Sequence, residues 1–107
     1  MTRVRPAMLD SIRHAGELRE LLKELECDLG LHDLSRVERD LIYAMHVLGR
    51  RTGQVSTAEL WTHPLIEDLN QATFHRAIRE LIDRGMIRRE PGERARYALL
   101  AAAPRPS

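Results

Sequence analysis

The sequence predicts a mainly α-helical protein with a small β-hairpin close to its C-terminal end. Three segments carry apolar residues at intervals of three or four, the period of a helix that is buried on one side. Two strand-like segments follow, joined by a turn that contains proline and glycine. At 107 residues, with 43% hydrophobic and 31% charged residues, the chain has the composition of one modest globular domain rather than of a disordered protein.

The first apolar segment, residues 8–29, is expected to form an amphipathic helix of about 20 residues. Gly30 suits the left-handed conformation that commonly ends a helix. The apolar stripe is large for a chain of this length to cover alone. We therefore expect residues 1–34 to mediate a homodimer, the alternative being that the helix covers the core of its own chain. The expected dimer contacts are Leu9, Ile12, Leu18, Leu22, Leu25 and Leu29.

Two capping boxes, each a serine followed three residues later by a glutamate, predict where the next two helices begin. The box at Ser35 opens a helix that runs to about Leu48, and the glycine-rich stretch 49–54 then turns the chain. A short extended segment is expected at residues 54–56. The box at Ser56 opens a further helix, which Pro64 keeps brief or breaks near residue 63.

The stretch "NQATFHRAIRELIDRGMIRR", residues 70–89, carries the strongest helix signals. Asn70 suits the cap and Gly85 the stop. The expected buried stripe consists of Phe74, Ala77, Ile78, Leu81 and Ile82. On a helical wheel of about 100° per residue, we place Gln71, Ala72, His75 and Arg79 opposite that stripe, with Arg76 on its flank.

The hairpin follows this helix directly. Its first strand begins at residues 86–87, "EPGER" supplies the turn, and "ARYALL" is the returning strand. Residues 101–107, "AAAPRPS", have two prolines and no apolar period, so a disordered tail is expected there.

Two short helices followed by a basic hairpin are the organisation of a winged helix-turn-helix domain, expected over residues 35–100. Residues 70–89 resemble the corresponding segment of MarR-like winged-helix regulators. The matching positions are Thr73, Arg76, Ile78, Leu81, Gly85, Ile87 and Arg89. The wing segment "EPGERAR" is shorter than in typical members, and their C-terminal dimerisation helix is not predicted, so the N-terminal helix would have to supply the interface.

The resemblance implies a transcriptional regulator that binds double-stranded DNA sequence-specifically as a homodimer. Charge agrees with this, because residues 70–98 hold seven arginines against four acids although the chain's net charge is only +1. A recognition helix at about residues 71–84 would enter the major groove, where arginine reads guanine and glutamine reads adenine. A wing at about residues 88–97 would contact the backbone or minor groove. The expected DNA-binding residues are Ser56, Thr57, Gln71, Thr73, His75, Arg76, Arg79, Arg89, Arg94 and Arg96.

Other functions have little support in the sequence. The five histidines lack zinc-site spacing, the single Cys27 cannot form an internal disulfide, and no phosphate loop or nucleophile motif is present, so we expect no metal, no cofactor and no enzyme. No apolar run suits a membrane span, which predicts a cytoplasmic protein, nucleoid-associated when bound to DNA. The sequence does not decide whether a small-molecule effector binds. The alternative function is a winged-helix module that binds protein without DNA.

Overall fold

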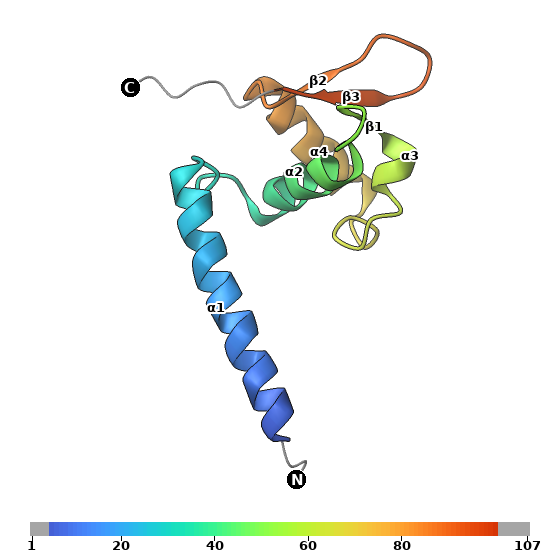
Figure 1. Ribbon diagram of the computed structural model, residues 1–107. Coiled ribbons are helices and arrows are strands. Elements are labelled where there is room, and N and C mark those ends of the chain that lie inside the picture. Colours follow the sequence, from blue (N-terminus) through green and yellow to red (C-terminus); the bar gives the residue numbers. More distant parts are fainter. Residues whose placement is uncertain (1–4, 101–107) are drawn as a thin grey trace. The chain divides into compact units, whose positions relative to one another are not determined.

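The computed structural model describes residues 5–100, and the expected tail at 101–107 lies outside them (Figure 1). The chain divides into two compact units, residues 1–34 and residues 35–107, which are described separately. The fold is mainly helical with a small three-stranded antiparallel sheet, which confirms the fold class at that level. Among the described residues, no helix combines the length and apolar character needed to cross a membrane.

The N-terminal unit is built on α1 (Pro6–Asp28). The helix starts two residues before the predicted apolar segment because proline is well suited to its first position. Gly30 adopts a φ of 73°, as predicted for the stop. The Leu31 amide donates to the Glu26 carbonyl at 2.7 Å and the Gly30 amide to the Cys27 carbonyl at 3.2 Å, which is the Schellman pattern that closes a helix end. No residue of α1 is buried.

Up to residue 100, the second unit contains three helices, α2 (Arg36–Leu48), α3 (Thr57–Leu60) and α4 (Gln71–Asp83). Both predicted capping boxes are present: the Ser35 hydroxyl accepts from the Glu38 amide, and the Ser56 hydroxyl from the Glu59 amide. The Asn70 side chain caps α4 by accepting from the Thr73 amide at 2.8 Å. Each cap satisfies a backbone amide that has no partner within its helix. The predicted break after α3 is also confirmed, since residues 61–69 form turns and bends.

The sheet joins β1 (Gln54–Ser56), β2 (Ile87–Arg89) and β3 (Arg96–Leu99) in the order β1-β3-β2. The β2–β3 hairpin and the extended segment at β1 were predicted. The sequence did not predict that β1 pairs with β3, with Val55 opposite Tyr97. In Figure 1 the sheet lies along one side of the three helices of this unit.

The core of the second unit lies between these helices and the inner face of the sheet. Four of the five apolar residues expected on the buried side of α4 are buried, but Ile82 is 37% exposed, so the prediction for Ile82 was wrong. Its position lies at the edge of the stripe, about 80° from Phe74 on the helical wheel. The Trp61 and Phe74 rings pack with centroids 4.6 Å apart. The fully buried large side chains are Phe74, Leu41, Met45, Leu60, Ile66, Leu81, Ile87 and Val55.

Candidate nucleic-acid interface

The surface of α4 carries most of the predicted DNA contacts. Gln71, His75, Arg76 and Arg79 are exposed and Thr73 is half-buried. The opposite side of the helix is anchored by its four buried residues and by the Asn70 cap. The polar groups therefore project from a helix that is fixed in place on its inner side.

The exposed side chains of α4 do not share one direction. At about 100° per residue, Arg76 and Arg79 lie on either side of the point opposite the buried stripe, with Ala72 and Asp83 between them. His75 lies nearer the core, and its ring meets the buried Phe74 ring edge-on at 5.3 Å. The wheel that put Arg76 on the flank and Gln71 and His75 on the outer face was therefore wrong, since Gln71 lies only about 60° from Phe74. Arg76 and Arg79 are the side chains best placed to reach a groove.

Both arginines are also available for contacts. Among the described residues, neither the Arg76 nor the Arg79 guanidinium has a hydrogen-bond or ion-pair partner. A guanidinium carries five N–H donors in a planar fork, the geometry that matches two acceptors on one guanine edge. Neither side chain would have to break an existing interaction in order to bind.

A hollow of about 460 Å³ lies beside these arginines, between the start of α2 and the outer side of α4. Three carboxylates line it together with the two guanidinium groups. One of them, Glu80, accepts a 2.9 Å hydrogen bond from Arg84 in the next turn. The acids reduce the positive potential on this side of α4, so the basic character of the surface is local. The lining residues are Ser35, Val37, Glu38, Thr73, Arg76, Ala77, Arg79, Glu80 and Asp83.

Ser56 and Thr57, both expected to contact DNA, have structural partners at the junction of β1 and α3. The Ser56 hydroxyl accepts from the Glu59 amide at 3.1 Å. The Thr57 amide donates to the Ala95 carbonyl at 3.1 Å, and its hydroxyl approaches the same oxygen at 3.5 Å. Ser56 acts as the predicted cap of α3, and Thr57 ties α3 to the residue that precedes β3. That anchoring role was missed because it depends on a contact between residues 38 positions apart.

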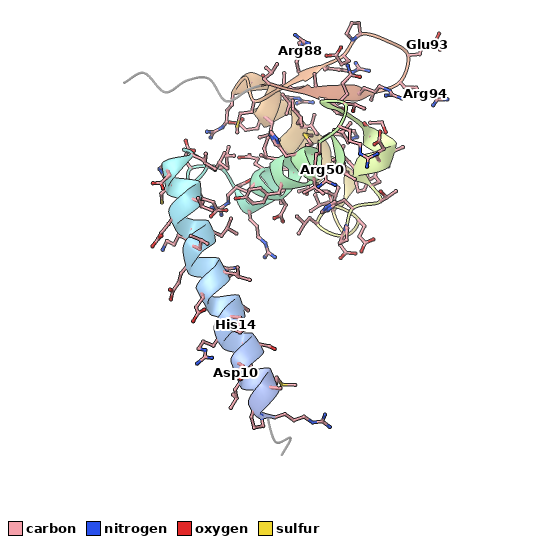
Figure 2. All side chains as sticks on the ribbon, in the orientation of Figure 1. Asp10, His14, Arg50, Arg88, Glu93 and Arg94 are labelled. Carbon is pink, nitrogen blue, oxygen red and sulfur yellow. The ribbon has the colours of Figure 1, made fainter. Side chains whose placement is uncertain are left out.

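The connection between β2 and β3, residues 90–95, corresponds to the tip of the predicted wing. The Glu90 amide donates to the Arg96 carbonyl at 2.8 Å and closes its base. Gly92 has a φ of 141°, which side-chain-bearing residues rarely adopt. Figure 2 shows Glu93 and Arg94 projecting from the outer end of this connection. Arg94 is exposed, as its predicted role requires.

The strand arginines lie on different faces of the sheet. Directly paired residues of an antiparallel ladder share a face. Arg89 is opposite Tyr97, which is buried and in turn opposite the buried Val55. Arg89 therefore lies on the core-facing side, exposed only because β2 ends there. Arg96, one residue before Tyr97 on β3, lies on the outer face.

Arg88 also lies on the outer face and was not among the predicted contacts. It is opposite Ala98, two positions from Arg96 on the same strand. Its guanidinium donates to the Glu90 carboxylate at 2.9 Å, while its side chain remains 64% exposed. The alternation of side chains along a strand could have identified Arg88, had the register been known.

Two further findings concern the remaining predicted residues. In α1 and its C-terminal cap, the six expected dimer contacts are between 40% and 65% exposed. Within residues 5–100, no group of three His, Cys, Asp or Glu side chains is arranged to hold a metal ion. Comparison of the chain with models of protein families, with curated proteins and with solved structures finds no match.

Proposed function

We propose that this chain is a sequence-specific, double-stranded DNA-binding transcriptional regulator of the winged helix-turn-helix type. In this proposal α4 enters the major groove and the 90–95 turn lies on the backbone or in the adjacent minor groove. The observation that carries it is the pair of outward-facing guanidinium groups of Arg76 and Arg79, which have no partner among the described residues, on a helix whose other side is fully anchored.

The hairpin supports the same assignment. Arg94 at the outer end of the 90–95 turn and Arg96 on the outer sheet face follow α4 in the same compact unit. Contacts of these two arginines with phosphate groups would fix the position of the domain on the duplex, whereas base contacts select the sequence. Ser56 and Thr57 have a supporting role in this arrangement, since Ser56 caps α3 and Thr57 holds α3 against the residue that precedes β3.

The regulator is proposed to act as a homodimer through α1, whose apolar side chains are exposed in the single chain. A two-fold symmetric dimer would recognise two half-sites related by the same symmetry, which predicts a palindromic operator. Such a regulator would work in the cytoplasm, on the nucleoid when bound.

Selection from a random pool of duplexes tests the proposal and requires no assumption about the operator sequence. The full chain should enrich one motif with two related halves, and its affinity for that motif should fall steeply as salt rises, because bound arginines release counterions. Enrichment of no motif, with no salt-dependent binding to any duplex, would refute the DNA-binding assignment.

A protein-binding module is the second candidate function. The observation that favours it is the mixed charge of the hollow beside α4, where Glu38, Glu80 and Asp83 accompany the two arginines. A partner with both signs of charge would suit that surface better than a polyanion does. In the duplex selection, this candidate predicts no enriched motif.

A further inference from the structure

The exposed apolar side chains of α1 follow a seven-residue repeat. Counting from Met8, the first position of each heptad is occupied by Met8, Ala15, Leu22 and Leu29, and the fourth by Ser11, Leu18 and Leu25. The repeat continues through Leu29, whose backbone is still right-handed helical at φ −85° and ψ −4°. A spacing that alternates between three and four residues over this length forms the seam of a left-handed coiled coil.

Not every exposed apolar residue of α1 belongs to this seam. Leu9 is in the second position of its heptad, on the far side of the helix from Leu18, Leu22 and Leu25. In a dimer built on this seam, Leu9 would therefore face away from the second copy, unlike the other expected dimer contacts. Ile12 and Leu21 occupy the positions that flank the seam and widen it.

We propose that α1 pairs with α1 of a second copy as a parallel, in-register, two-stranded coiled coil. The inference rests on the homodimer of the proposed function but not on DNA binding. In register, Leu18, Leu22, Leu25 and Leu29 each meet the same leucine of the second copy, and the smaller Ala15 and Ser11 likewise each meet the same residue of the second copy. The seam is thus self-complementary, which argues for a second copy over an unrelated helix.

The antiparallel arrangements are less favourable. Full antiparallel overlap of α1 would place Leu18 on Ala15 and Leu22 on Ser11, leaving space where leucine should meet leucine. Shifting the helices so that the four leucines pair with one another reduces the antiparallel overlap to residues 18–29. Only the parallel pair uses the whole helix with matched layers.

The size of the seam predicts a dimer that forms reversibly. The 23 residues of α1 span about 34 Å at 1.5 Å per residue, and covering a third to a half of a cylinder about 11 Å wide removes roughly 400–600 Å² per helix. Stable interfaces begin near roughly 600 Å² per partner. The dimer should therefore dissociate on dilution through the micromolar range.

Cysteine cross-linking distinguishes the orientations. In the full chain with Cys27 replaced by serine, Met8→Cys places two thiols in one layer of the parallel coil, within the roughly 4–7 Å Cα separation that a disulfide needs. In the full antiparallel overlap the same thiols would be roughly 26 Å apart. Leu9→Cys is the matched control, since Leu9 adjoins Met8, is similarly exposed at 56% against 52%, and lies off the seam.

The expected result is rapid, near-complete disulfide dimer formation by Met8→Cys under mild oxidation, and at least tenfold slower formation by Leu9→Cys. If Met8→Cys fails while mixed Ser11→Cys and Leu22→Cys proteins cross-link, the coil is antiparallel and the inference is wrong. If both thiols react equally slowly while sedimentation still shows a dimer, the homodimer survives and the heptad seam is overturned. A monomer at all concentrations overturns both, and none of these results depends on DNA binding.

Discussion

Replacing Arg76 and Arg79 together by alanine should abolish selective DNA recognition while leaving the fold intact. Neither guanidinium has a partner among the described residues, so no native interaction is lost. Both side chains are exposed, and alanine is the most favourable helix residue. The stability change should stay within about 0.5 kcal/mol.

The cost in binding is larger. Each bidentate contact between arginine and guanine is worth about 1–3 kcal/mol. Two contacts in one domain therefore account for about 2–6 kcal/mol, which weakens Kd by at least roughly 30-fold. Non-specific duplexes should lose much less affinity, because they gain little from base contacts.

The matched control is Arg50→Ala with Arg51→Ala, which removes the same two charges from the exposed turn between α2 and β1. That turn leads to the end of the sheet where the Leu99 amide meets the Gly53 carbonyl, away from the 90–95 connection. Fluorescence anisotropy against the selected motif and a scrambled duplex, at two salt concentrations, gives all four affinities. If both double variants lose the same specific affinity, net charge rather than the surface of α4 controls binding, and the reasoning fails.

Three further changes test other parts of the molecule. Arg94→Ala should weaken specific and scrambled duplexes by similar factors and lower the salt slope by roughly one unit, in the same anisotropy titrations; a selective loss of sequence preference would reverse the assigned roles. Leu22→Glu should dissociate the homodimer in sedimentation whereas Leu9→Glu should not, because only Leu22 lies on the heptad seam. Gly49→Ala should destabilise the second unit by about 1–3 kcal/mol, since its Cβ would come within 2.9 Å of a backbone oxygen. Gly16→Ala, with open space around the added Cβ, should instead stabilise α1 by about 0.5–1 kcal/mol. Chemical denaturation that found the Gly49 variant more stable than the Gly16 variant would contradict the contact geometry.

The sequence was sufficient for the helix boundaries because their signals are local. A capping box spans four residues, and both boxes, at Ser35 and Ser56, form the hydrogen bonds expected of them. The same holds for the glycine stops, where Gly30 and Gly85 adopt φ values of 73° and 74°. In each case the residue type and its immediate neighbours determine the conformation.

The pairing of β1 with β3 could not be predicted from the same kind of signal. A three-residue strand is too short to show alternation, and its partner lies some forty residues away. The register of β2 against β3 is also a tertiary property, and it decides which face of the sheet each arginine occupies. The sequence therefore predicted a basic hairpin, but not that Arg89 lies on the core-facing side of the sheet while Arg88 and Arg96 lie on its outer face.

The distribution of charge explains why selectivity should depend on few groups. A net charge of +1 provides little long-range attraction for a polyanion. Around Arg76 and Arg79, the carboxylates of Glu38, Glu80 and Asp83 reduce it further. Non-specific binding, which depends on phosphate contacts alone, should accordingly be weak. A duplex that contains the recognised sequence gains additional affinity only from base contacts. These contacts require a guanidinium that is not already paired with a carboxylate when it enters the groove. The low net charge, together with two arginines that have no partner within residues 5–100, thus favours a high ratio of specific to non-specific affinity over high affinity for any duplex.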